Sequence, residues 1–172
     1  VPDHSCILRG VKKLAAGHYL LLQLGRPVPA PTQYWDLDFS KRTRGSQAEL
    51  SEELLRLMRQ GVTSRMVADV PLGAFLSGGV DSSSVVALMA EASRQPIKTC
   101  SIGFDVGALD ESEYAETVAR RFATDHRSRK VAADDFSLID TLAYHFDEPF
   151  ADASALPTYR VCELAREQVT VA

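Results

Sequence analysis

The chain has 172 residues, of which 45% are hydrophobic and 24% charged, and its formal net charge is −4. This composition is typical of a globular protein with one core, and the absence of a basic excess argues against a nucleic-acid-binding surface. Three cysteines at unrelated spacings argue against a disulfide framework or a zinc site, and no run approaches the roughly 20 apolar residues of a membrane span. We therefore predict a cytoplasmic protein that contacts neither nucleic acid nor membrane.

The first forty residues differ in pattern from the rest of the chain. An apolar run from Tyr19 to Leu24 predicts a strand, and the prolines between Pro27 and Pro31 predict a stiff connection. The aromatic pair Tyr34 and Trp35 indicates a second strand or an anchor. Residues 1–40 therefore form a separate segment from residues 41–172 in this interpretation.

A helical period begins after Ser40. Ser46 and Glu49 have the spacing of a capping box, which predicts a helix start at this point. The apolar residues that follow fall on one helical face. They are Leu50, Leu54, Leu57, Met58 and Val62.

From Asp69 onward, short apolar runs alternate with helical patterns. We predict strands at 71–76, 97–104, 127–131 and from 169, and helices at 85–92, 110–122, 136–146 and 157–168. Strand and helix alternating four times indicate an α/β fold, a parallel sheet with helices on both faces. Such sheets bind ligands outside the carboxyl ends of their strands.

Two of these helices carry more detailed predictions. Asp110 and Glu113 resemble a capping box for a helix that would bury Tyr114, Val118 and Phe122. The helix at 136–146 would end at Pro149, and its apolar positions are Phe136, Ile139, Leu142 and Phe146.

A glycine loop follows the first of these strands and precedes a helix. Backbone amides and a helix N-terminus converge there and attract anions. Gly78 and Gly79 permit positive φ and carry no Cβ that would hold a phosphate away from the backbone, and the hydroxyls of Ser77, Ser82 and Ser83 add donors. The loop is not a Walker A motif, because the required lysine is absent.

Asp81 is the unexpected residue in an anion site. A phosphate and a carboxylate 4 Å apart repel each other by about 4 kcal/mol at an effective dielectric constant near 20. A Mg²⁺ ion between them would remove that repulsion, since Mg²⁺ binds through one or two carboxylates together with substrate phosphates. The alternative is that Asp81 only caps the following helix and the glycines make a tight turn.

The segment "LSGGVDSS" resembles the pyrophosphate loop of the ATP pyrophosphatases, which cleave ATP between the α and β phosphates. Six segments, one of which includes this loop, resemble the glutamine-hydrolysing asparagine synthetase family, and the resemblance covers nearly the whole chain. They are "GVKKLAAGHYLLL" with "YWDL", "DVPLGAFLSGGVDSS", "SIGF", "DESEYAETVARRF" and "FDEPFADASALPTYRVCELA".

The resemblance implies an adenine nucleotide alpha hydrolase-like (Rossmann-like) fold, here truncated, and an ATP-dependent amide-forming ligase. Residues 1–40 would be the tail of the N-terminal glutaminase domain with a linker, and 41–172 the first part of the synthetase domain. Leu76 and Ile102 would line the adenine or ribose site, unless they are plain core residues. Ser77, Gly78, Gly79, Asp81 and Ser82 would hold the pyrophosphate, with Asp81 as the metal ligand.

In the implied reaction an aspartate carboxylate attacks the α phosphorus of ATP, and ammonia displaces AMP from the acyl-adenylate. The family's glutaminase begins with a cysteine, where this sequence has Val1, and a second acidic loop follows a strand like "VTVA". We therefore expect no glutaminase activity, no turnover by the chain alone, and self-association, for example as a homodimer. No catalytic residue is assigned, and Asp152 and Ser154 lie either near the acceptor or in a helix cap.

Two other functions remain open. A relative could amidate another carboxylate, such as a sugar acid or a β-amino acid in lactam closure. A non-catalytic module could use the same loop to sense ATP or AMP. A role in tRNA thiolation is disfavoured, because the chain has no basic surface and no paired catalytic cysteines.

Overall fold

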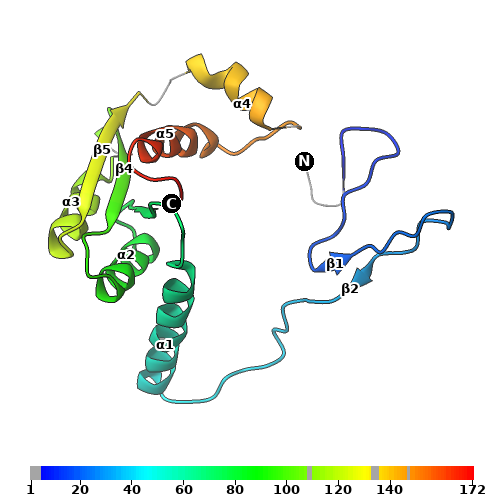
Figure 1. The fold of residues 1–172 in the computed structure, drawn as a ribbon, viewed down its shortest axis with the longest axis horizontal. Coiled ribbons are helices and arrows are strands. Elements are labelled where there is room, and N and C mark those ends of the chain that lie inside the picture. The colour runs from blue at the N-terminus through cyan, green and yellow to red at the C-terminus, as the bar shows by residue number, and fades with distance from the viewer. Residues whose placement is uncertain (1–4, 108–109, 133–135, 147) are drawn as a thin grey trace. The chain divides into compact units, whose positions relative to one another are not determined.

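The computed structural model describes residues 5–107, 110–132, 136–146 and 148–172. The chain divides into two compact units (Figure 1). One comprises residues 1–44 and 143–151, and the other residues 45–142 and 152–172.

The smaller unit contains a short antiparallel pair, β1 (His18–Tyr19) and β2 (Thr32–Gln33). The predicted strand from Tyr19 to Leu24 is wrong beyond its first residue, and Leu21, Leu22 and Leu24 are exposed. The prolines of the following connection explain the short pairing, because a proline has no amide to donate to a neighbouring strand. Tyr34 and Trp35 follow β2 directly, and their amides donate to the carbonyl of Gly17.

The larger unit contains a parallel sheet in the order β3 (Gly73–Phe75), β4 (Lys98–Phe104), β5 (Asp125–Val131). On the other edge of β3, Val171 forms a parallel bridge with Leu72, and the amide of Gly73 donates to the Val171 carbonyl over 2.9 Å. The fourth strand predicted from residue 169 is thus present as a single bridge. β3 therefore lies between β4 and the segment at Val171, so the strands that follow it in the chain lie on both sides of it. The strand order reverses at β3.

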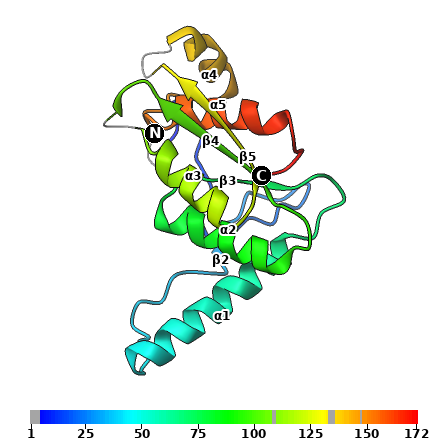
Figure 2. The same cartoon turned by 90° about the vertical axis from the view of Figure 1, so that its left-hand side faces the viewer.

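Helices lie on both faces of this sheet (Figures 1 and 2), which confirms the predicted fold class. α2 (Val80–Ala92) and α3 (Ser112–Arg121) cover one face, and α5 (Ala155–Arg166) covers the other. The first core consists of Ala74, Leu76, Val86, Met89, Ile97, Ala115 and Ala119. The second core, beneath α5, consists of Cys100, Leu164, Ala165 and Val169.

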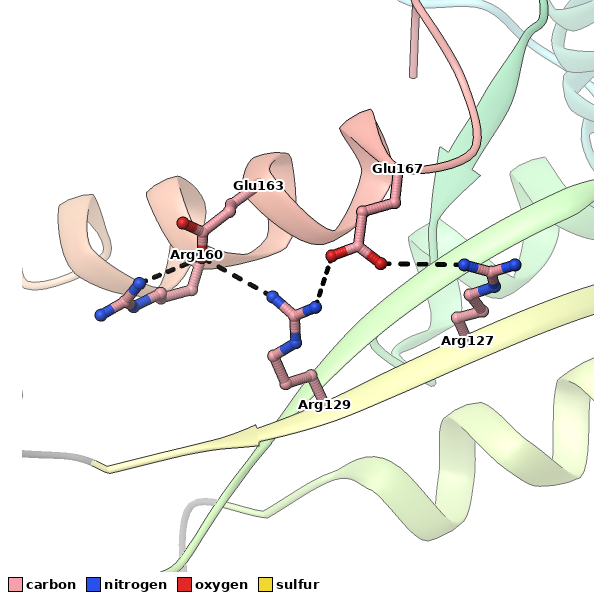
Figure 3. Close-up of polar contacts among 5 residues, drawn as sticks. All are labelled: Arg127, Arg129, Arg160, Glu163 and Glu167. Atoms are coloured by element: carbon pink, nitrogen blue, oxygen red, sulfur yellow. Dashed lines mark hydrogen bonds and ion pairs between the residues drawn. The ribbon is translucent and has the colours of Figure 1, made fainter.

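Ion pairs add to the contact between α5 and the sheet (Figure 3). Arg129 on β5 donates to Glu167 over 2.6 Å and lies 3.6 Å from Glu163. Arg127, two residues earlier on the same face of β5, lies 3.7 Å from Glu167. These charged groups are all partly exposed, so they border the apolar contact rather than replace it.

The helix predicted after Ser40 is α1 (Gln47–Arg65), and it starts with the predicted capping box. The Ser46 amide and hydroxyl donate to the Glu49 carboxylate over 2.7 and 2.9 Å. The predicted apolar face is only partly correct: Val62 packs against the first core, whereas Leu50, Leu54 and Leu57 are 39–58% exposed. α1 contacts α2 through the second half of α1, where Arg59 donates to Glu91. The first half of α1 has no packing partner among the described residues.

α3 corrects a second prediction. Ala115 and Ala119 are its buried residues, and Tyr114 is 68% exposed. Val118 and Phe122 are only partly buried. The small side chains of Ala115 and Ala119 face the sheet, and they allow α3 to lie close to the strands.

The expected helix at 136–146 consists of a 3₁₀ turn, η2 (Phe136–Leu138), and α4 (Ile139–His145), and it ends before Pro149 as predicted. Leu138 is buried and Ile139 is 55% exposed. The predicted burial of Phe136 lies outside the described side chains.

Candidate phosphate-binding site

The predicted loop joins β3 to α2 at the carboxyl edge of the sheet. Gly79 is the N-cap residue of α2, and the first bond of the helix runs from the Ser83 amide to the Gly79 carbonyl over 3.0 Å. The amides of Val80, Asp81 and Ser82 therefore have no carbonyl within the helix to bond. Together with the positive end of the helix dipole they form a site for an anion.

The two glycines of the loop play different structural roles. Gly78 has φ +84°, and a Cβ there would lie 2.5 Å from the Cβ of Tyr114 and 2.6 Å from the amide of Ala115. Gly79 has an ordinary φ of −67°, and a Cβ there would meet only the Ser77 hydroxyl at 3.3 Å. Gly78 is therefore required by the contact with α3, and only Gly79 is left to give a ligand close access to the backbone.

Serine hydroxyls close the loop. The Ser77 and Ser82 hydroxyls are 2.9 Å apart, and the Ser77 amide donates to the Ser82 hydroxyl over 3.3 Å. The Gly79 amide donates to the Ser77 hydroxyl over 3.3 Å, and the Ser82 hydroxyl donates to the Gly79 carbonyl over 3.2 Å. The structure thus brings together Ser77, Gly79 and Ser82 as predicted. The hydroxyl oxygen of Ser83, by contrast, is buried, so it is not presented to a ligand.

Asp81 is the second residue of α2, and it does not cap the helix. The N-cap residue is Gly79, which has no side chain to form a cap bond, and Asp81 is exposed. Among the described residues no hydrogen bond or ion pair involves its carboxylate. The alternative that Asp81 serves only as a cap is therefore wrong, and the carboxylate stands next to the unpaired amides of the same turn.

Leu76 and Ile102 do not bring their side chains together. Leu76 is 1% exposed and packs in the first core, and its amide donates to the Cys100 carbonyl over 2.8 Å. Ile102 is half-buried and lies two residues after Cys100, so it faces the α5 side of the sheet. The two side chains therefore lie on opposite faces of the sheet, and the predicted adenine or ribose contact of either residue remains a prediction.

The first turn of α3 belongs to the surroundings of the loop, and the sequence analysis missed it. Tyr114 and Ala115 lie against Gly78, which places a second helix N-terminus at the same edge of the sheet. A close backbone contact is one general reason for a glycine, but the local sequence does not identify the partner of that contact.

Asp110 lies in this region as well. It does not form the predicted capping box with Glu113; its carboxylate accepts from the amide and hydroxyl of Ser112 over 3.1 and 2.5 Å. These two bonds, the amide of Phe104 and the charge of Lys130 lower the pKa of Asp110.

Asp152 makes a local turn before α5. Its carboxylate accepts from the Ser154 amide over 2.8 Å, and the hydrogen bonds from Ser154 lower the pKa of Asp152. This geometry places Asp152 and Ser154 at the start of α5, as expected for residues that begin a helix.

In the described part of the chain, no three His, Cys, Asp or Glu residues are grouped so that they could hold a metal ion. Asp81 is a single carboxylate beside an anion site. Within the same residues, no helix is long and apolar enough to cross a bilayer.

The sequence is similar to those of known proteins. The family model described as asparagine synthase matches residues 53–172. A Methanocaldococcus jannaschii protein named "Putative asparagine synthetase (glutamine-hydrolyzing) 2" is 40% identical over 173 residues, which cover 99% of this chain and 33% of that protein. Asparagine synthetase (glutamine-hydrolyzing) 1 of Bacillus subtilis is 31% identical over 173 residues, covering 100% of this chain and 27% of that protein.

Among solved structures, an NH3-dependent NAD synthetase from Campylobacter jejuni aligns with a TM-score of 0.45 and 13% identity, over 68% of this chain and 52% of that one. The chain spans 33% and 27% of the two curated relatives. The match to the family model covers more than half of the chain, and the chain therefore belongs to the asparagine synthase family.

Proposed function

We propose that this chain binds the polyphosphate of ATP as part of an ATP-dependent amide-forming ligase of the glutamine-hydrolysing asparagine synthase type. The observation that carries the proposal is the corner at residues 77–82. There the unpaired amides of α2, two linked serine hydroxyls and an exposed carboxylate meet beside β3, where the strand order reverses. Family membership supplies the reaction class.

The residues of this corner fit a magnesium ion bound together with a nucleotide. Asp81 is an oxygen ligand with no competing partner among the described residues, and it lies two residues after the Gly79 N-cap. A single carboxylate is a poor metal site by itself, but Mg²⁺ in phosphate sites takes only one or two carboxylates and completes its shell with phosphate oxygens and water. Bound Mg²⁺ would neutralise charge on the pyrophosphate.

The role of this chain in the reaction is to hold the leaving group. An acceptor carboxylate, that of aspartate, attacks the α phosphorus of ATP, pyrophosphate departs, and ammonia derived from glutamine converts the acyl-adenylate to an amide. The amides of Val80, Asp81 and Ser82 and the α2 dipole stabilise the negative charge that collects on the pyrophosphate. Catalysis here consists of positioning and charge stabilisation, since no described side chain is required as a base.

A direct test is calorimetric titration of the 172-residue chain with ATP, with and without Mg²⁺. Replacing Asp81 with Asn keeps the shape and removes the charge, so we expect the Kd for MgATP to rise about ten- to hundredfold, the range for a charge-assisted contact. Asp140→Asn is the matched control, because Asp140 is also an exposed carboxylate in the first turn of a helix. It should leave the Kd unchanged.

Two results would count against the proposal. Equal affinity of wild type and Asp81→Asn for MgATP would remove the carboxylate from the site. Tight binding of AMP that is independent of Mg²⁺ would favour the nucleotide sensor instead.

A further inference from the structure

We propose that Asp110 is a positioning residue for the phosphate loop, which it holds in place through the first turn of α3. One consequence of this inference, a lower affinity for nucleotide when Asp110 is lost, rests on the proposed function. Its structural part, the dependence of the loop on Asp110, concerns only contacts within this chain.

The loop rests directly on α3. A Cβ at Gly78 would lie 2.5 Å from the Cβ and 2.8 Å from the carbonyl carbon of Tyr114, and 2.6 Å from the amide nitrogen of Ala115. Two backbones that approach this closely have no room for an intervening side chain, so a movement of the first turn of α3 must be transmitted to Gly78. Gly78 immediately precedes Gly79, the N-cap of the helix whose amides form the anion site.

Asp110 determines where α3 begins. The cap residue of α3, Glu111, makes no side-chain cap bond, and the Asp110 carboxylate instead accepts from the Ser112 amide and hydroxyl. Ser112 is the first residue of α3, and Tyr114 follows two residues later, within a single helical turn of about 5.4 Å. The carboxylate is therefore fixed within about one turn of the contact with Gly78.

The same carboxylate also bonds the end of the sheet. The carboxylate lies close to the Phe104 amide at the last residue of β4, which contributes to its lowered pKa, and it lies 3.8 Å from the ammonium group of Lys130 on β5. A Cβ at Gly103 would come within 2.8 Å of one Asp110 oxygen and 3.3 Å of the Ser112 hydroxyl, so Gly103 leaves the space that the carboxylate occupies. Asp110 is only 18% exposed. One partly buried carboxylate thus lies between two strand ends and the start of the helix that supports the loop.

Four variants separate this role from a general contribution to stability. Asp110→Ala removes the acceptor, and Asp110→Asn keeps one acceptor oxygen and loses the charge. Gly103→Ala displaces the carboxylate from the opposite side without removing it. Glu49→Ala is the matched control, because it removes a carboxylate that accepts from a serine amide and hydroxyl at the start of α1, whereas the residues of α1 that share a pocket with Ser82 lie at the other end of the helix.

The first measurement is amide hydrogen exchange of residues 77–82 without nucleotide. Loss of a helix-end bond typically raises local opening about fivefold, so we expect at least that acceleration in Asp110→Ala and Gly103→Ala, less in Asp110→Asn, and none in Glu49→Ala. Unchanged loop exchange in Asp110→Ala, with acceleration confined to α3, would overturn the inference, whatever the melting temperature does.

The second measurement is the Kd for MgATP of the same variants. Weaker binding by Asp110→Ala and Gly103→Ala, with Glu49→Ala equal to wild type, supports the inference. If wild type binds and Asp110→Ala binds equally well, the inference is wrong and the proposed function stands. If wild type does not bind, the proposed function fails, and hydrogen exchange alone decides whether Asp110 positions the loop.

Discussion

The two faces of the parallel sheet are held to their helices by different means. On the α2 and α3 face, small apolar side chains and a glycine bring backbones into direct contact, as at Gly78 and Ala115. On the α5 face, a smaller apolar core is bordered by the partly exposed ion pairs of Figure 3. Close packing resists displacement, whereas ion pairs near water adjust at little cost. The phosphate loop is built on the rigid face.

The largest expected effect that tests this comparison is at Gly78. Gly78→Ala adds a carbon within 3 Å of backbone atoms of α3 and forces a non-glycine residue to positive φ. We expect the free energy of unfolding to fall by about 3 kcal/mol or more, from overpacking and backbone strain together. Urea denaturation of the variant measures this loss.

The neighbouring glycine supplies the control. Gly79→Ala places its methyl group near only one serine hydroxyl at an ordinary φ, so its cost should stay within about 1 kcal/mol. Similar losses at the two positions would show that the contact with α3 is not rigid.

This difference between adjacent glycines also shows how far the sequence can lead. Alternating apolar runs predicted the parallel sheet, its helices and the loop, because period and glycine position are local properties. The contact of Gly78 with Tyr114 depends on how the loop packs against a helical residue 36 positions later in the chain, which no local pattern contains. The exposed first half of α1 is the opposite case: its leucines predicted a buried face, but packing depends on whether another element lies opposite.

A smaller effect is expected at His126, under α3. Its ring nitrogens lie 2.9 Å from the Thr99 hydroxyl and 3.2 Å from the Ser101 hydroxyl, both on buried residues of β4. Burial lowers the pKa of His126, and the charge of Glu116 opposes this in part. The folded state therefore favours the neutral ring, so its contribution is complete above the unfolded pKa near 6.5 and is lost as the pH falls through the folded pKa.

Thermal unfolding between about pH 7.5 and pH 5.5 should show this loss in wild type. A His126→Gln variant, which keeps a polar group toward the hydroxyls, should lose less stability over the same interval even if it is less stable throughout. The expected difference is well below the effect at Gly78. A steeper loss in the variant would mean that the ring is better accommodated when charged, which contradicts a tightly packed α3 face.

The smallest effect is expected at the centre of the ion pairs on the α5 face. Arg129→Met keeps the aliphatic stem and removes the guanidinium that reaches Glu167 and Glu163. These side chains are 38–46% exposed, so we expect a loss of about 1 kcal/mol or less, and about 1 M salt should reduce the difference from wild type, because it screens charges more than about 3 Å apart. Arg56→Met, which breaks an isolated pair with Glu53 on α1, is the control for a single surface ion pair. A salt-insensitive loss several times larger at Arg129 would show that α5 is held as rigidly as α3, and the contrast between the two faces would then disappear.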